Sequence, residues 1–371
     1  MGGGAIGLAS AWRAAQAGMR VVLLERGRLA SGASHVAAGM LAPSGEADPG
    51  ERPLLALGLV SAQRWPQFAE ELARAGGIDP GHRRCGTLRV AGDRDEAEAL
   101  EREAAVRHEL GIACTLLRGG DAREREPALA PSIRMALELP DDHAVDPRRV
   151  CAALAAAARA SGALLREGAE VARVLSDDGR VTGVELDDGS LLAAERVVVA
   201  AGCWSGGEAL LPDGAGVPVR PVKGQILRLR DPSGPGLLSS VIRRESIYLV
   251  PRGDGRYVLG GTTEEQGFDT SVTAGAVWEL IRDAAEVVPG VLELELEQAQ
   301  AGLRPGTPDN APLLGAGALD GLVWATGHHR NGILLCPITA EIVVAALRGG
   351  SVADVAAPFL PGRFAPLGAL A

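Results

Sequence analysis

The chain has 371 residues, of which 47% are hydrophobic and 23% charged, and its formal net charge is −10. Such proportions are typical of a globular protein with a sizeable core, for which two domains are the natural expectation. The acidic balance, with no run of Lys or Arg, predicts no nucleic-acid partner. Because no apolar stretch has the length of a membrane span and no signal-peptide pattern is present, we expect a cytoplasmic protein without stable membrane association.

The cysteines indicate neither a disulfide framework nor a metal site. No C-x-x-C pair and no Cys/His spacing of zinc ligands occurs among Cys85, Cys114, Cys151, Cys203 and Cys336. We therefore expect reduced thiols. The adjacent His328 and His329 predict no metal site either, because neighbouring side chains point to different sides and no third ligand is near.

The chain opens with a G-x-G-x-x-G motif formed by Gly2, Gly4 and Gly7. Apolar residues at helical spacing follow, and 20–24 (RVVLL) is typical of a buried strand that ends at Glu25. This order predicts a dinucleotide site, in which backbone N–H groups and a helix N-terminus bind the pyrophosphate and the acid binds the ribose hydroxyls. A carboxylate at Glu25 also disfavours the 2′-phosphate of NADP. The cofactor contacts expected here are Gly2, Gly4, Ala5, Ile6, Gly7, Glu25 and Arg26.

A motif of this kind normally follows a hydrophobic strand, whereas only Met1 precedes it here. That strand would be central in a parallel sheet, and its loss would leave ladder hydrogen bonds of its neighbours unpaired. We therefore expect the natural chain to start upstream, with about five or six additional Val/Ile-rich residues.

Three further segments carry a family resemblance. The run 31–43 (SGASHVAAGMLAP) resembles the second flavin contact of the D-amino-acid oxidase superfamily, most closely that of the glycine oxidases that supply thiazole synthesis in thiamine production. The segments 301–312 (AGLRPGTPDNAP) and 321–335 (GLVWATGHHRNGILL) resemble the same family. The motifs occur along the whole chain in the same order as in this family, and the resemblance implies FAD as the cofactor.

The resemblance also implies which other residues contact FAD. Small side chains in 31–43 let the backbone lie against the ribityl chain and flavin ring, Val171 contacts the adenine, and Gly202 ends a buried strand beside the cofactor. The loop between a strand at 322–325 and a helix at 333–347 directs backbone N–H groups at the pyrimidine end, which favours the anionic reduced flavin. The residues are Ala33, Ser34, Ala38, Gly39, Met40, Val171, Gly202, His329, Arg330, Asn331, Gly332, Ile333 and Leu334.

The same resemblance implies a site for a small amino acid. Arg304 binds the substrate carboxylate, as the planar fork of arginine suits, Tyr248 adds a phenolic hydrogen bond, and Arg330 lies near substrate and flavin. The implied reaction is hydride transfer from the α-carbon to FAD, which oxygen then reoxidises with formation of hydrogen peroxide. The imino acid from glycine hydrolyses to glyoxylate and ammonia or passes to thiazole synthesis. No protein base is needed, so orientation and electrostatics supply the catalysis.

The predicted fold class is α/β: a Rossmann-type FAD-binding domain interwoven with a mainly antiparallel α+β substrate domain. The FAD-binding domain is assigned to 1–84, 144–220 and 303–350, the substrate domain to 85–143 and 221–302, and a loose tail to 351–371. Within these ranges we expect a hairpin through Asp188-Gly189, strands at 225–229, 246–250 and 257–260, and helices at 94–110 and 273–288.

Several alternatives stay open at this point. Sarcosine or small D-amino acids are further candidate substrates, and a D-amino-acid dehydrogenase or a sarcosine-type oxidase is the nearest rival activity. A non-catalytic flavoprotein fold without cofactor is the rival from another class. FAD held covalently through His35 is an alternative to a noncovalent flavin, as dimethylglycine dehydrogenase shows for a comparable loop. The resemblance also implies a homotetramer.

Overall fold

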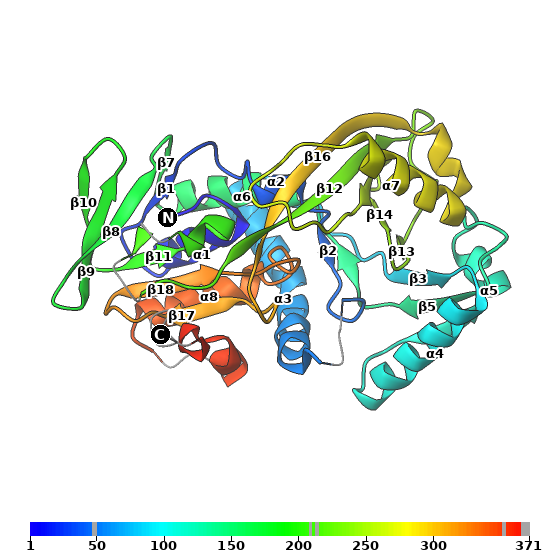
Figure 1. Ribbon diagram of the computed structural model, residues 1–371, viewed down its shortest axis with the longest axis horizontal. Coiled ribbons are helices and arrows are strands. Elements are labelled where there is room, and N and C mark those ends of the chain that lie inside the picture. Colours follow the sequence, from blue (N-terminus) through cyan, green and yellow to red (C-terminus); the bar gives the residue numbers. More distant parts are fainter. Residues whose placement is uncertain (47–49, 208–209, 212–214, 351–353, 365–371) are drawn as a thin grey trace.

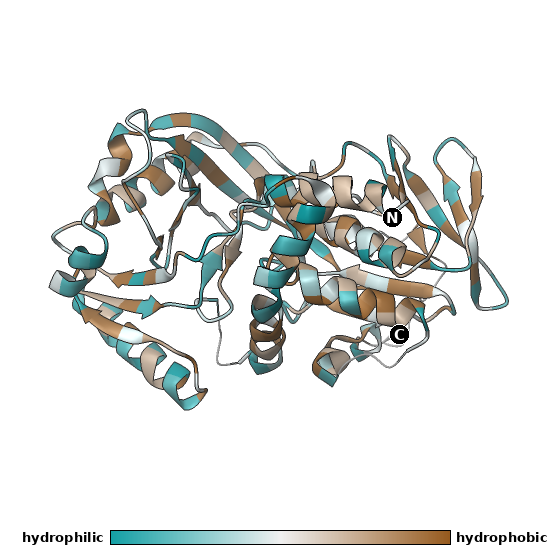
Figure 2. Ribbon diagram, turned by 180° about the vertical axis from the view of Figure 1, so that it is seen from behind, coloured by the Kyte–Doolittle hydropathy of each residue, from teal (hydrophilic) through white to brown (hydrophobic). Residues whose placement is uncertain are grey.

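The computed structural model describes residues 1–46, 50–207, 210–211, 215–350 and 354–364. Figure 1 shows two lobes side by side, one around the N-terminus and one built on the long strands β12 and β16. Hydrophilic and hydrophobic residues alternate along the outer helices of both lobes in Figure 2, as expected of helices that bury one face. Within the described ranges, no helix combines the length and apolar character needed to cross a membrane.

The first lobe contains a mostly parallel sheet in two parts. In one part, β1 (Val22–Glu25) pairs in parallel with β7 (Leu164–Glu167). In the other, β11 (Val197–Val199) pairs in parallel with β18 (Leu322–Thr326), which pairs antiparallel with β17 (Leu313–Ala316). The buried strand expected at 20–24 is thus observed as β1.

Residues at the start of the chain bridge these two parts. The N–H of Gly2 donates to Leu24 O at 2.8 Å, and the N–H of Ala200 donates to Met1 O at 2.9 Å. Met1 and Gly2 therefore lie between β1 and β11, at the position of a central strand. The additional upstream strand stays a prediction.

Three helices pack against this sheet, namely α1 (Ala5–Gln16), α6 (Pro147–Ala160) and α8 (Cys336–Leu347). A fourth helix, α3 (Arg52–Gly76), packs on α6 and α8. The rings of Trp12 and Trp65 each meet Phe68 edge-on at 5.4 Å between centroids. Edge-to-face pairs of this kind add to the burial of the rings, so the Trp12–Phe68 pair helps fix α1 against α3.

The first lobe also carries smaller antiparallel elements. The strands β8 (Val171–Asp177), β9 (Arg180–Leu186) and β10 (Leu191–Ala193) form a sheet in the order β10-β9-β8, which confirms the expected hairpin. Two short strands, β2 (Met40–Leu41) and β6 (His143–Ala144), pair with each other.

The second lobe is built on an eight-stranded sheet in the order β16-β12-β15-β14-β13-β3-β5-β4. Its pairs are antiparallel except for β13 with β3. Three helices accompany it: α4 (Arg94–Glu109), α5 (Gly119–Arg125) and α7 (Ala274–Val287). The strands are β3 (Thr87–Ala91), β4 (Thr115–Arg118), β5 (Met135–Leu139), β12 (Arg220–Arg230), β13 (Val241–Arg243), β14 (Tyr248–Pro251), β15 (Arg256–Gly260) and β16 (Glu295–Gly306).

The division of the chain into two interwoven domains stays a prediction, and its ranges can be located on the observed strands. The ranges 85–143 and 221–302 both contribute strands to the one mainly antiparallel sheet. The helices expected at 94–110 and 273–288 and the three expected strands are present as α4, α7, β12, β14 and β15.

The helix expected over 333–347 begins later than predicted. Residues 332–335 form turns, and α8 starts at Cys336 with Pro337 in its first turn. Proline lacks an N–H donor and has a fixed φ, so it favours the first helical positions. The backbone before it is therefore free to turn along the cavity described below.

The prediction of a loose tail is wrong for residues 354–364. They form short 3-10 helices at Asp354–Phe359 and Pro361–Arg363. Phe359 is 1% exposed in the same core as Trp12 and Trp65. The remaining tail residues, 351–353 and 365–371, lie outside the described residues.

We predict that Phe359→Ala lowers the free energy of unfolding by about 3 kcal/mol, because it leaves a cavity in the core of the first lobe. Urea titration measures this. Leu360→Ala is the control, since Leu360 is 37% exposed and its truncation should change stability little. Equal effects of the two variants would contradict the buried position of Phe359.

Candidate active site

A cavity of about 590 Å³ lies between the two lobes and draws its lining from both. Its volume is in the range of sites that hold cofactors and small ligands. Twenty of the residues singled out from the sequence line it, namely Gly2, Gly4, Ala5, Ile6, Glu25, Arg26, Ala33, Ser34, Ala38, Gly39, Met40, Val171, Gly202, Tyr248, Arg304, His329, Arg330, Asn331, Gly332 and Ile333.

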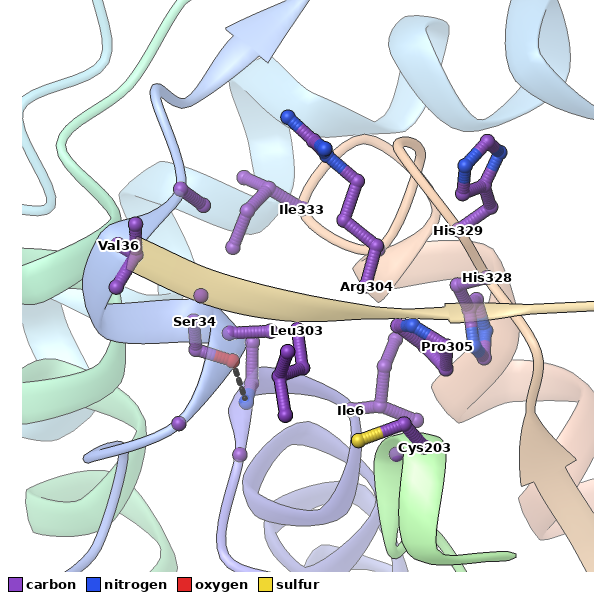
Figure 3. Close-up of a pocket in the computed structure, with 18 of the residues that line it drawn as sticks. Ile6, Ser34, Val36, Cys203, Leu303, Arg304, Pro305, His328, His329 and Ile333 are labelled. Atoms are coloured by element: carbon purple, nitrogen blue, oxygen red, sulfur yellow. Dashed lines mark hydrogen bonds between the residues drawn. The ribbon is translucent and has the colours of Figure 1, made fainter. Parts of the chain in front are cut away.

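The N-terminus of α1 faces this cavity. Its N-cap, Gly4, provides no side-chain cap, and no acidic residue lies in the first turn. Ser34 Oγ accepts a hydrogen bond from the N–H of Ala5 at 3.0 Å (Figure 3). The partial positive charge of the helix end is therefore directed at the cavity, where a pyrophosphate would be stabilised.

Gly7, the third motif glycine, does not line the cavity. A Cβ on Gly7 would lie 1.9 Å from Gly2 O, and a Cβ on Gly2 would lie 2.3 Å from Ala200 O. The structure therefore gives no support to a direct contact between Gly7 and the cofactor, which stays a prediction. The role of Gly7 is to let α1 pack directly on the loop that lines the cavity.

Glu25 is held by backbone donors at one end of the cavity. Its Oε2 accepts from the N–H of Gly3 at 2.7 Å, and its Oε1 accepts from the N–H of Gly27 at 2.9 Å. The neighbouring Arg26 stacks on Trp204, with the guanidinium carbon 3.9 Å from the ring centroid. An ordered acid beside this stacked pair suits the ribose and adenine half of a dinucleotide.

The small-residue run is shaped by buried arginines of the second lobe. Arg252 donates to Ala38 O at 2.7 Å and to Val145 O at 2.8 Å. Gly39 has a φ of +81°, and a Cβ there would lie 2.1 Å from Val145 O. The backbone of this run thus has one conformation available, and it presents small side chains to the cavity.

The side chain of His35 does not line the cavity. Its carbonyl accepts from Arg148 at 3.2 Å and from Arg228 at 2.9 Å. Burial and these two charges lower the pKa of the imidazole. The geometry therefore gives no support to covalent attachment of the flavin through His35.

The loop after β18 contributes two neutral histidines. Burial lowers the pKa of His328 to about 3, and its Nε2 lies 2.9 Å from Thr339 Oγ1. Burial, assisted by the charges of Arg330 and Arg304, lowers the pKa of His329 to about 4. The described residues contain no group of three side chains that could hold a metal ion.

Leu334, the last residue of the predicted loop contacts, does not line the cavity. Its carbonyl accepts from Ser61 Oγ at 2.7 Å and from Trp65 Nε1 at 2.9 Å. A Cβ on Gly58 would lie 3.5 Å from the Leu334 side chain. The turn before α8 directs Leu334 into α3, so the structure gives no support to its predicted cofactor contact, which stays a prediction.

Arg304 and Tyr248 come together at the other end of the cavity. In Figure 3, Arg304 points to one side of its strand and Leu303 to the other. Arg304 donates to Thr262 O at 3.0 Å, and a Cβ on Gly224 would lie 2.2 Å from its Nη1. Burial raises the pKa of Tyr248, and the charge of Arg304 opposes this rise.

Five charged lining residues were not predicted from the sequence, namely Glu46, Glu170, Arg243, Arg244 and Glu245. Glu46 forms an ion pair with Arg243 and another with Arg330, the latter at 3.2 Å. Burial alone would raise the pKa of Glu46, but the two arginine charges lower it below its usual value. No sequence motif marks Glu46 or Arg243, since they meet only in the fold. Other lining residues that the sequence did not single out include Gly3, Ser31, Cys203, Trp204, Gly224, Ile226, Thr263 and Pro305.

Comparison with known proteins agrees with this geometry. Residues 1–346 match the family described as FAD dependent oxidoreductase. The chain belongs to this family. FAD is therefore its cofactor, and the lining fits FAD: open helix N–H groups and an ordered Glu25 at one end, and a backbone-lined space of small residues between them and Arg304.

Individual relatives extend the likeness over the whole chain. A glycine oxidase of Geobacillus kaustophilus is 37% identical over 362 residues, which cover 97% of this chain and 94% of the relative. The bifunctional protein ThiO/ThiG of a Synechocystis species is 36% identical over 98% of this chain, which spans about half (53%) of that protein. The crystal structure of glycine oxidase from Geobacillus kaustophilus has a TM-score of 0.92, with 36% identity and coverage of 98% and 97% of the two chains.

We predict that Gly7→Ala weakens FAD binding by about tenfold or more, or about 1.4 kcal/mol, because the added methyl group forces α1 away from Gly2. The ratio of flavin to protein absorbance after dialysis measures this. Gly275→Ala in α7 is the matched control, because a Cβ there meets nothing within 4 Å. Full FAD retention by the Gly7 variant would contradict the packing role.

We also predict a pH-dependent contribution of His328 to stability. Its folded pKa of about 3 lies below the unfolded value, so the unfolded chain takes up the proton first and stability is lost as the pH falls below about 6.5. Between pH 7 and pH 4 the loss is about 3 kcal/mol. The difference in unfolding free energy between wild type and His328→Asn should therefore shrink by about that amount in urea titrations. A constant difference would show that His328 is not buried as a neutral group.

Proposed function

We propose that this chain catalyses the FAD-dependent oxidative deamination of glycine to the imino acid, with oxygen reduced to hydrogen peroxide, and that the imine supplies thiazole synthesis. The observation that carries the proposal is the state of Arg304. No acidic side chain pairs with it in the described part of the chain, and its hydrogen bonds go to the carbonyls of Lys223 and Thr262. An arginine without a counter-ion in a cavity is suited to bind a substrate carboxylate.

The surrounding residues orient that substrate. The Tyr248 hydroxyl lies beside Gly260 and Gly261, where added Cβ atoms would come within 2.3 and 2.9 Å of it. It is thus held close to Arg304, whose charge acts on its pKa. The two contacts fix one end of the amino acid and leave the α-carbon to face the cofactor.

Glu46 and His329 are poorly suited to act as general bases in this region. Glu46 is engaged by two arginines, and His329 has a pKa of about 4 because of burial and neighbouring cations. The substrate amine therefore gives its proton to solvent. FAD, when bound, supplies the acceptor for the α-hydrogen as hydride and passes the electrons to oxygen.

The relatives favour glycine over other small amino acids. The two glycine oxidase comparisons cover nearly the whole chain at 36 to 37% identity. Sarcosine and small D-amino acids are additional substrates to test. The cytoplasmic location and the homotetramer implied by the family resemblance are part of this proposal.

An anaerobic visible spectrum before and after glycine tests the proposal. Bleaching of the flavin band by glycine, followed by peroxide formation on admission of air, is the expected result. If only sarcosine or D-alanine bleaches the flavin band, that compound and not glycine is the substrate. Bleaching without peroxide would point to a dehydrogenase, and a protein that takes up no flavin would be a non-catalytic fold.

The variant Gly224→Ala tests whether the position of Arg304 determines glycine binding. The added methyl group would lie 2.2 Å from Arg304 Nη1, so the guanidinium must move. We expect an increase in KM for glycine of about 10- to 100-fold, with FAD content unchanged. Gly216→Ala, where a Cβ meets nothing within 4 Å, is the control. An unchanged KM would show that Arg304 does not bind the substrate.

A further inference from the structure

Glu46 brings a carboxylate of the protein itself into the cavity. The Glu46 side chain is 12% exposed, and it lies between Arg243 of β13, which is 15% exposed, and Arg330 of the loop after β18. The acid thereby joins the two lobes across the cavity. One negative charge faces two positive charges at this point.

The backbone that carries Glu46 is fixed by buried charged side chains. Asp142, which is fully buried, accepts from the N–H groups of Ser44 at 3.1 Å and Gly45 at 2.5 Å. Arg107, which is 3% exposed, donates to Ser44 O at 2.8 Å. Charged groups are costly to bury without such partners, so the position of Glu46 is built into the fold.

Glu46 acts in the same region as the carboxylate-binding pair. Arg243 of β13 is the direct ladder partner of Tyr248 on β14, so the two side chains lie on the same face of the sheet. Glu46, Arg304 and Arg330 line the same cavity as this pair. A substrate held by one carboxylate at Arg304 would therefore direct a second carboxylate toward Arg243 and Arg330. Glu46 already occupies that position with a carboxylate of its own.

We propose that Glu46 determines specificity by filling the Arg243–Arg330 pair, so that amino acids with a second carboxylate are excluded. The substrates excluded in this way are of the type of iminodiacetate, which is N-carboxymethylglycine. Like charges placed together repel each other and are a common means of rejecting a wrong ligand. This inference rests on the proposed oxidation of glycine at Arg304.

The test is Glu46→Gln in the FAD-loaded enzyme. Glutamine keeps an oxygen that can accept from Arg243 but removes the negative charge. We expect the ratio of kcat/KM for iminodiacetate to that for glycine to rise by about tenfold or more. An unchanged ratio would overturn the proposal.

Two further variants separate this effect from a general change of charge. Glu245→Gln removes an acid from the same cavity lining, but Glu245 has no ion pair among the described residues, so the ratio should stay as in wild type. Adding Arg243→Gln to Glu46→Gln should cancel most of the gain. Two results would overturn the proposal. One is that Glu245→Gln raises the ratio of kcat/KM values as much as Glu46→Gln does. The other is that the raised ratio persists in the double variant that also lacks Arg243.

A binding measurement makes the test independent of turnover. Glutarate has the chain length of iminodiacetate but no amine to oxidise, and butyrate is its single-carboxylate counterpart. Changes in the flavin absorbance give both dissociation constants. Glu46→Gln should bind glutarate about tenfold more tightly and butyrate as wild type does.

The single variant Arg243→Gln should change glutarate binding in the opposite direction to Glu46→Gln. It leaves Glu46 with less positive charge around it and should weaken glutarate binding selectively. If it weakens neither acid, or both equally, the proposal fails even where Glu46→Gln does not retain FAD. If glycine fails to bleach the flavin of wild type while these binding shifts occur, the proposed function fails and the role of Glu46 stands.

Discussion

The site depends on the ladder between β12 and β16, which pairs 220–230 with 295–306. This ladder carries Arg304 from the second lobe to the edge of the first. Successive side chains of a strand face opposite sides, so a slip of one residue would exchange Arg304 with Leu303 and remove the cation from the substrate side. Gly224 on β12 leaves the space in which the guanidinium lies. The position of the carboxylate-binding group is therefore a property of strand register.

Around this ladder, the fold controls which charges face the cavity. Among the residues that the structure describes, Arg304 has no acidic partner, whereas Arg243 and Arg330 share Glu46. Both histidines of the loop after β18 are kept neutral by burial. The cation beside Tyr248 is thus available to a ligand, whereas the two cations beside Glu46 are compensated. In a partly desolvated site this difference decides which anion is bound.

The cofactor side depends on backbone contacts. Gly2, Gly7 and Gly39 each allow an approach that a Cβ would block, and Arg252 holds the carbonyls of Ala38 and Val145. These contacts join the motif loop, α1 and the small-residue run into one surface. The cation that shapes the first lobe comes from the second lobe, so neither lobe forms the FAD site alone.

The sequence by itself determined the features that short-range patterns encode: the α/β class, the G-x-G-x-x-G turn with Glu25, and the hairpin at Asp188-Gly189. Through family resemblance it also gave FAD and twenty of the residues that line the cavity. Only the tertiary structure decided the rest. Gly7 and Leu334 proved to be packing residues, because a contact between helix and loop is not visible in spacing. Phe359 is buried although its segment is rich in Ala and Pro, because the site that receives it is formed by distant elements. Glu46, Arg243 and Arg330 meet from three distant parts of the chain, and a charge cluster of that kind exists only once the two lobes have folded together.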